Sequence, residues 1–130
     1  MLETKLFSLS QQTLPNGSTY FYYQMHRVSE ATQQDFDVLS QSLALICDNT
    51  NERNSIVLDC SQINQCEFIS RFWTLSFGNA LSITNKGLNK FVLISQSKLL
   101  KTLSKPIIAI KKASKYTFIV ASLDAALAQL

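Results

Sequence analysis

The sequence predicts an α/β fold, in which a mixed five-stranded sheet packs against about four helices in the order β-β-α-β-α-β-α-β-α. Three observations support this prediction. Residues 55–60 and 90–95 are short apolar runs, and the helix-length segment between them is typical of a crossover that joins two parallel strands. Residues 15–17, Pro-Asn-Gly, indicate a tight turn between two strands. Residues 29–50 instead repeat apolar side chains at helical spacing.

The amino-terminal half is predicted to form a hairpin, a helix and a buried strand. Residues 6–12 and 19–27 flank the turn and are rich in β-favouring side chains, which predicts two antiparallel strands. In the helical segment that follows, Thr32 and Asp35 match a capping box, which indicates a helix start. Polar residues close this helix and lead into the strand 55–60.

The segment 68–84 is predicted to be the crossover helix, because its apolar residues recur on one helical stripe. Aromatic side chains are concentrated on this stripe, so it either lies wholly in the core or leaves Phe68 or Trp73 to line a groove for a partner or an apolar ligand.

The carboxyl-terminal part is predicted to hold two further helices and a strand. Ser97 is placed to cap a short helix that ends at residue 103, because Pro106 interrupts the helical pattern. Residues 107–113 fit either a new helix or an irregular crossover. Residues 116–120 form the last predicted strand, and Ser122 is placed to cap a terminal helix.

The length of 130 residues predicts a single domain, residues 1–130. Only 16% of the residues are charged, and such a surface is compatible with self-association, so that a monomer and a homodimer both stay open. The sequence has no apolar run of membrane-spanning length and no secretory signal pattern, so we expect a cytoplasmic protein. Its three cysteines, Cys47, Cys60 and Cys66, form no CxxC pair and are predicted to be buried or free thiols.

The charge of the chain is unevenly distributed. Residues 1–67 hold three basic and eight acidic residues, a balance of −5, whereas residues 68–123 hold nine basic residues and no acidic one. This second part forms either a solvated surface or a basic face for an acidic protein, an anionic membrane or a nucleic acid. Few arginines and no interleaved aromatic residues argue against sequence-specific nucleic-acid binding. The lysines of the predicted basic face are Lys86, Lys90, Lys98, Lys101, Lys105, Lys111 and Lys112.

The residue inventory favours no enzyme class. His26 is the only histidine, so neither a Ser-His-Asp triad nor a multi-histidine metal site is predicted. The three glycines stand far apart, and no glycine-rich phosphate loop can be assigned. We therefore expect a non-enzymatic protein without a metal or another cofactor.

Three patterns resemble the anti-sigma factor antagonist (STAS) superfamily, which has the SpoIIAA-like fold, and in particular its bacterial STAS/CRAL-TRIO-like branch. They are the strand end Ile-Val-Leu-Asp-Cys at 56–60, the helix with Trp73 that runs to Gly-Leu-Asn-Lys-Phe-Val-Leu-Ile at 87–94, and the ending Phe-Ile-Val-Ala-Ser-Leu-Asp-Ala-Ala-Leu at 118–127. The resemblance covers nearly the whole chain and implies the SpoIIAA-like arrangement of the sheet and helices.

The resemblance also implies a regulatory function. Regulatory members of the family carry a phosphorylatable serine in an Asp-Ser-Ser-Gly-like motif at a helix start, and a kinase controls partner binding through it. The matching region here departs from that motif, since Ser70 is the nearest equivalent and Thr74 follows one turn later. A phosphate on Ser70 would be favoured at the amino terminus of the predicted helix.

The resulting prediction is an interaction module that presents the loop 61–67 and the start of the helix 68–84 to a protein partner, such as a kinase or an anti-sigma-like regulator. The alternative is a carrier or sensor of a small apolar or lipid ligand, whose basic face meets anionic head groups. The residues predicted to bind the partner or ligand are Asp59, Ser61, Phe68, Arg71 and Trp73.

Overall fold

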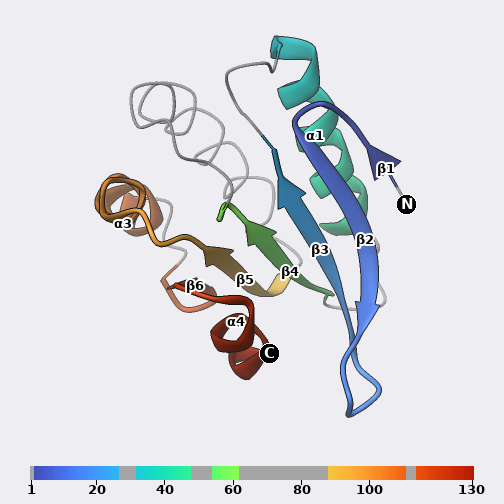
Figure 1. The fold of residues 1–130 in the computed structure, drawn as a ribbon, viewed down its shortest axis with the longest axis vertical. Helices are drawn as coiled ribbons and strands as arrows, with labels where there is room; N and C mark the ends of the chain where they lie inside the picture. Colours follow the sequence, from blue (N-terminus) through green and yellow to red (C-terminus); the bar gives the residue numbers. More distant parts are fainter. Residues whose placement is uncertain (1, 27–31, 48–53, 62–87, 111–113) are drawn as a thin grey trace.

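The computed structural model describes residues 2–26, 32–47, 54–61, 88–110 and 114–130 (Figure 1). Six strands form one mixed sheet, and three helices lie within the described ranges. In chain order the elements are β1 (Leu2–Glu3), β2 (Phe7–Thr13), β3 (Thr19–Met25), α1 (Gln33–Cys47), β4 (Asn54–Asp59), β5 (Leu88–Ile94), α3 (Lys98–Ile110), β6 (Thr117–Val120) and α4 (Leu123–Gln129).

The predicted α/β class is confirmed, and the strand count differs from the prediction. The additional strand is β1, which pairs antiparallel with β2. With two residues, β1 is too short to show the alternation by which a strand is recognised in a sequence. The helix predicted for residues 68–84 lies outside the described residues.

The predicted hairpin is confirmed as β2 and β3, which pair antiparallel. Gly17 lies in its turn with φ +89°, a conformation that glycine adopts without strain. The Leu14 N–H donates to the Ser18 carbonyl oxygen at 2.7 Å and closes the turn. From β3 onward the strands are parallel neighbours, and the sheet order β1-β2-β3-β4-β5-β6 follows the chain.

Local capping signals set the starts of the helices. At α1 the Thr32 N–H donates to Asp35 Oδ2 at 2.9 Å, and the Asp35 N–H donates to Thr32 Oγ1 at 3.4 Å, which is the predicted capping box. Ser97 Oγ accepts from the Leu100 N–H at 3.2 Å before α3, and Ser122 Oγ accepts from the Ala125 N–H at 3.2 Å before α4. These caps satisfy amide groups that have no partner within the helix.

The prediction that Pro106 ends its helix was wrong, because α3 continues through Pro106 to Ile110. The ring of Pro106 lies on the exposed side of the helix, and two apolar residues on the other side, Leu100 and Ile108, are buried. Their burial stabilises the helix on both sides of the proline and offsets the lost hydrogen bond. Residues 107–110 are therefore helical, and residues 111–113 lie outside the described residues.

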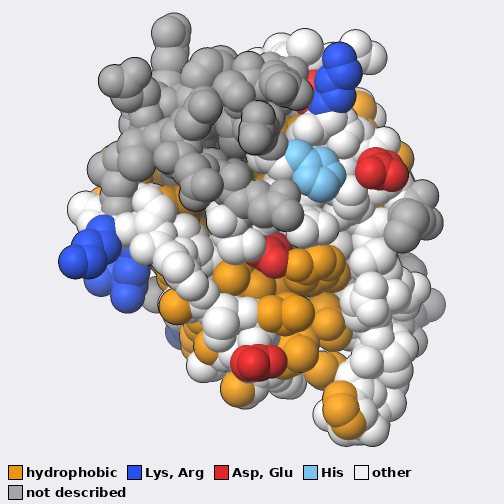
Figure 2. Space-filling view, viewed as in Figure 1, with side chains coloured by type: hydrophobic (Ala, Val, Ile, Leu, Met, Phe, Trp, Pro, Cys, Tyr) orange, Lys and Arg blue, Asp and Glu red, His pale blue; other side chains and the backbone are white. Residues whose placement is uncertain are grey.

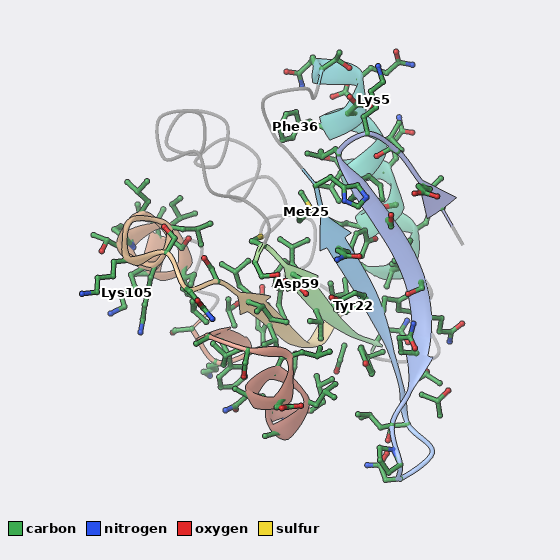
Figure 3. All side chains as sticks on the ribbon, viewed as in Figure 1. Lys5, Tyr22, Met25, Phe36, Asp59 and Lys105 are labelled. Carbon is green, nitrogen blue, oxygen red and sulfur yellow. The ribbon has the colours of Figure 1, made fainter. Side chains whose placement is uncertain are left out.

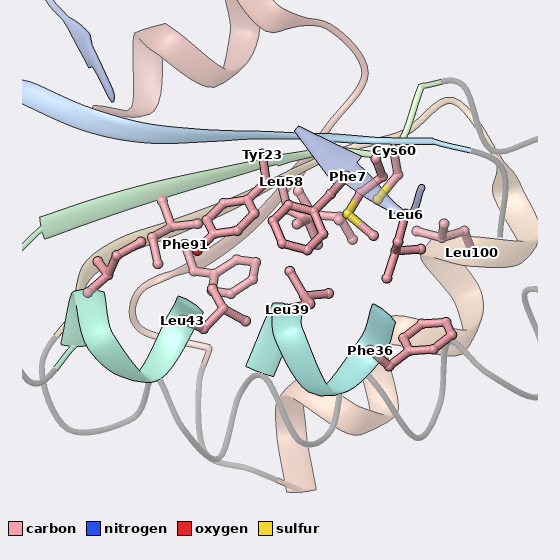
Figure 4. Close-up of a cluster of buried hydrophobic side chains, with 14 of the residues drawn as sticks. Leu6, Phe7, Tyr23, Phe36, Leu39, Leu43, Leu58, Cys60, Phe91 and Leu100 are labelled. Atoms are coloured by element: carbon pink, nitrogen blue, oxygen red, sulfur yellow. The ribbon is translucent and has the colours of Figure 1, made fainter. Parts of the chain in front are cut away.

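The sheet has an apolar core on each of its two faces, because successive side chains of a strand point to opposite faces. On the first, which we name the α1/α3 face, Tyr23, Leu58 and Phe91 pack with Leu39 and Leu43 of α1 (Figure 4).

The second face, which we name the α4 face, carries a smaller cluster. Val57 and Val92 are fully buried there beside Ala126 of α4, and hydrophobic side chains gather over this region in Figure 2. Leu127 and Leu130 are partly buried against the same cluster, whereas Leu123 is 39% exposed. None of α1, α3 and α4 combines the length and apolar character of a membrane-spanning helix.

Candidate functional site

The carboxyl ends of the parallel strands β3 to β6 meet at one edge of the sheet, where open α/β sheets bind their ligands. Backbone pairing continues just past two strand ends, because the Cys60 N–H donates to the Ile94 carbonyl oxygen and the Ser95 N–H donates to the Val120 carbonyl oxygen, both at 2.9 Å. We name this region the carboxyl edge. Its polar residues in the described ranges include His26, Asp59, Ser61, Ser95, Ser97 and Ser122.

Asp59 is the central polar residue of the carboxyl edge. The residue is 7% exposed, and its side chain lies on the α4 face, where the Tyr22 hydroxyl donates to Oδ2 (Figure 3). The Ser61 N–H donates to Oδ1 at 3.0 Å. Both carboxylate oxygens therefore accept hydrogen bonds. These two bonds hold Ser61, the first residue of the loop 61–67, close to β3 and β4.

The phenol of Tyr22 is a stable donor to this carboxylate. Desolvation raises its pKa well above the ordinary value, and the hydrogen bond and the negative charge of Asp59 raise it further. The hydroxyl consequently keeps its proton at neutral pH. Ser61 is exposed beside this pair.

The serines of the carboxyl edge cap turns and helices. Ser95 Oγ accepts from the Ser97 N–H at 3.1 Å, while the hydroxyls of Ser97 and Ser122 accept from amides in the first turns of α3 and α4. These bonds hold the backbone that leaves each strand, so the hydroxyls of Ser95, Ser97 and Ser122 have structural roles.

A serine–histidine pair at this end of the sheet was missed by the sequence analysis. Ser8 Oγ and the ring atom Nε2 of His26 lie 2.8 Å apart. The backbone N–H of His26 donates to the Leu6 carbonyl oxygen at 2.6 Å. The hairpin register pairs Ser8 with Gln24, which places His26 diagonally across from Ser8. Among the described residues no carboxylate bonds to His26, so the pair lacks the acid that orients a catalytic histidine. We interpret it as a cross-strand bond.

The predicted basic face divides between the two faces of the sheet. Lys98, Lys101 and Lys105 are exposed on α3. Lys90 instead follows the orientation of Val92 on the α4 face, and its Nζ donates to the Gln129 carbonyl oxygen at the end of α4. A cation is favourable at a helix carboxyl terminus.

Several of the predicted site residues lie outside the described ranges, which therefore place only Asp59 and Ser61 of the predicted binding set. Within those ranges no three His, Cys, Asp or Glu side chains come together as metal ligands. The site residues that lie outside are Phe68, Ser70, Arg71, Trp73, Thr74, Lys86, Lys111 and Lys112.

No protein-family model matches the chain, and neither a curated protein nor a solved structure matches it.

Proposed function

We propose that the protein is a non-enzymatic regulatory or interaction module of the STAS type, which presents the loop 61–67 and the start of the segment 68–84 to a protein partner. The observation that carries this proposal is the anchoring of Asp59 at the base of the loop, by the Tyr22 hydroxyl and the Ser61 amide. The element order also supports it, because a hairpin followed by parallel strands agrees with the order on which the resemblance is based.

The anchored carboxylate favours recognition over acid–base chemistry. A general acid or base must exchange a proton with a substrate, but both oxygens of Asp59 accept bonds from the protein and the residue is 7% exposed. Fixing the first residue of a loop lowers the entropy lost when a partner orders that loop. Asp59 is thus a positioning residue, and the exposed Ser61 begins the contact surface.

Regulation by phosphorylation is part of the same proposal and depends on the STAS resemblance. Ser70 and Thr74 are the proposed acceptors, and a kinase or an anti-sigma-like regulator is the proposed class of partner. A phosphate there would add about 1.5 to 2 negative charges next to the presented loop, which would change the affinity of a partner that contacts it.

Site-specific photo-crosslinking in the native host tests the proposal. A photoreactive residue at Ser61 should give one discrete protein adduct, whereas the same residue at Ser18, which is exposed in the hairpin turn, should give none. Asp59→Asn should lower the adduct yield at Ser61 while the protein stays folded by circular dichroism. Equal adducts at both positions, or no adduct at Ser61, would contradict the proposal.

Native mass spectrometry of the protein purified from its host separates this proposal from the carrier alternative. A stoichiometric protein partner, or a mass shift of one phosphate on Ser70 or Thr74, supports the interaction module. A bound lipid-sized mass supports a carrier of a small apolar ligand instead. The same spectrum reports whether the chain is a monomer or a homodimer.

A further inference from the structure

Strand β6 forms one edge of the sheet, because β5 is its only neighbouring strand within the described residues (Figure 1). The β5 residues that pair with it, 91–94, are all buried, whereas Phe118, Ile119 and Val120 of β6 are partly exposed. Phe118 and Val120 pack against the cluster of the α4 face, and Ile119 packs against the cluster of the α1/α3 face. Since both faces of β6 are covered, we attribute this exposure to the edge of the strand.

Two residues of β6 turn their backbone groups toward this edge. The Val120 carbonyl oxygen accepts from the Ser95 N–H at 2.9 Å, so the backbone groups of Val120 point toward β5. Backbone groups alternate in direction along a strand, which turns those of Thr117 and Ile119 outward. No other described residue bonds to the outward N–H and C=O groups of Thr117 and Ile119. The edge therefore offers both donors and acceptors to another strand.

β6 also lacks most of the features that protect an edge strand from pairing. Residues 116–121, Tyr-Thr-Phe-Ile-Val-Ala, hold no charged residue, no proline and no glycine, and most of them favour strands. The register of β6 with β5 has no bulge. At the opposite edge, β1 is only two residues long and one of them, Glu3, is charged. The edge suited to further pairing is therefore β6.

We propose that β6 pairs antiparallel with β6 of a second copy of this chain, so that the two sheets join into one. A twofold axis at Phe118 places Thr117 opposite Ile119 of the second copy, and each outward N–H then meets an outward C=O. The two Phe118 side chains face each other on the α4 face as a pair without backbone bonds, with Cα atoms about 4.5 Å apart. Such aromatic cross-strand pairs stabilise a sheet.

A second copy fits this edge because the strand is complementary to itself. Its outward residues lie symmetrically about Phe118, which is the condition for an interface that uses the same segment on both subunits. The register also places the flanking Lys115 opposite Ala121 of the second copy, so no like charges meet there.

The size of the interface sets its expected strength. Only the four residues of β6 pair in each copy, so we expect a weak dimer that forms at high micromolar concentration. The carboxyl edges of the two copies would point in opposite directions, because the paired strands run antiparallel. This proposal is independent of the proposed function, since it does not involve the loop 61–67.

Sedimentation velocity over a range of protein concentrations tests the pairing. Ile119→Pro removes the outward N–H and leaves the inward bonds to β5, because proline is tolerated on an edge strand where its N–H would face outward. Ile119→Ala is the matched control, since it also loses the isoleucine side chain but keeps the N–H. Circular dichroism checks that both variants are folded.

The wild type should dimerise at high micromolar concentration. Ile119→Pro should weaken the dimer about 30-fold, because each dimer loses both hydrogen bonds that the Ile119 N–H groups donate. Ile119→Ala should weaken it only a few-fold.

A disulfide tests the register. Phe118→Cys places two thiols opposite each other at the twofold axis, where the Cα separation is within the range that a disulfide spans. Val120→Cys is the control on the same face of β6, because its two thiols would lie on opposite sides of the axis and too far apart. Mild oxidation should join two chains through position 118, identified by mass spectrometry of the linked peptides, and not through position 120.

The proposal is overturned by a wild-type chain that stays monomeric at high micromolar concentration. It is also overturned by a dimer that Ile119→Pro and Ile119→Ala weaken equally, or by equal linkage through positions 118 and 120. A monomer that co-purifies with another protein, and loses it in Ile119→Pro but not in Ile119→Ala, would overturn it in favour of a strand from that protein.

Discussion

At the scale of single residues, the Tyr22–Asp59 bond is the polar contact that most directly shapes the carboxyl edge. Tyr22→Phe removes the donor to Oδ2 of a carboxylate that is 7% exposed. We expect the free energy of unfolding to fall by about 1 to 3 kcal/mol, because a hydrogen-bonded buried charge loses one of its two donors. Urea unfolding followed by circular dichroism measures this loss.

Tyr20→Phe is the matched control, since Tyr20 lies on the same strand and the same face, two residues earlier. Its hydroxyl forms no hydrogen bond with another described side chain, so its removal should change the stability by much less. Similar losses for the two variants would show that the Tyr22–Asp59 bond adds little. A double-mutant cycle with Asp59→Asn isolates the coupling between the two side chains.

Thr117 is the one described residue with a buried side-chain oxygen that has no hydrogen-bond partner. It is 8% exposed, at the start of β6. Thr117→Val replaces the hydroxyl with a methyl group of similar size, so we expect the free energy of unfolding to rise by about 1 kcal/mol. Chemical denaturation at neutral pH measures the change.

Thr102→Val is the corresponding control on α3, where the exposed Thr102 hydroxyl donates to the Lys98 carbonyl oxygen at 2.8 Å. Stability there should stay the same or fall slightly, because a partnered hydroxyl is lost at a solvated position. A destabilised Thr117→Val variant would show that the buried hydroxyl finds a partner in solution.

Contacts of site residues could be predicted only when the two partners lie close together in the sequence. Asp59 and Ser61 could be proposed from the sequence because they stand at the end of an apolar strand. Tyr22 was not assigned to Asp59, because that contact requires the parallel register in which Gln24 pairs with Asp59. The Ser8–His26 pair likewise depends on the hairpin register, which the length of the turn sets and side-chain identity does not.

At the scale of elements, α3 is stable despite the proline in its interior. Pro106 has no N–H to donate to the carbonyl oxygen of Thr102, four residues earlier. Pro106→Ala restores this donor at an exposed position. We expect the free energy of unfolding to rise by about 1 to 2 kcal/mol, since the helical cost of proline, about 3 kcal/mol, is partly offset by its restriction of the unfolded chain.

Thermal unfolding followed by far-ultraviolet circular dichroism measures this change. Ala109→Gly, one turn later on the exposed side of α3, should act in the opposite direction and lower the stability by about 1 kcal/mol. An unchanged melting temperature for Pro106→Ala would mean that α3 bends at the proline and already satisfies the free carbonyl.

The starts and ends of the helices show which structural features follow from residues close together in the sequence. The caps formed by Thr32 with Asp35, by Ser97 and by Ser122 were predicted correctly, because each involves residues at most three positions apart. The end of α3 was predicted wrongly, because its continuation depends on burial of Ile108 against the sheet. Tertiary packing of this kind overrides a local helix breaker.

At the scale of the whole molecule, the fold follows from the strand patterns. The hairpin turn determines an antiparallel start, and each later apolar strand adds a parallel neighbour, so that sheet order and chain order agree. Continuous apolar runs such as Ile56, Val57 and Leu58 indicate strands covered on both faces, as the two core clusters confirm. The assignment of helices to faces could not be predicted, because it depends on the direction of each crossover.

The core of the α1/α3 face also affects how the stability of the molecule depends on pH. Desolvation raises the pKa of the buried Cys60 thiol well above its ordinary value of 9.0, with a smaller contribution from the charge of Asp59. Desolvation likewise raises the pKa of the buried Tyr23 phenol above its ordinary value of 10.0, although the bond to Ser42 partly opposes this. Both groups therefore remain protonated in the folded state at pH values where they ionise in the unfolded chain.

The sign of the effect follows from proton binding. Below about pH 9 the folded and unfolded states both hold these protons, so the free energy of unfolding is fully retained. Above that pH the unfolded state releases protons that the folded state keeps, and the free energy of unfolding falls. Each group should contribute a slope of about −1.4 kcal/mol per pH unit once its unfolded form is ionised. Urea unfolding between about pH 7 and pH 11 measures the curve.

Tyr23→Phe/Cys60→Ala should be less stable than the wild type at neutral pH, because it loses the 2.8 Å bond to Ser42 and part of the core. Its stability should then fall less steeply above pH 9, by about the slope of two groups, while the two curves run parallel below that pH. Ionisation of the remaining tyrosines and the lysines affects both proteins alike, so the difference between the curves isolates Tyr23 and Cys60. Curves that stay parallel up to about pH 11 would show that neither buried group carries the alkaline loss of stability.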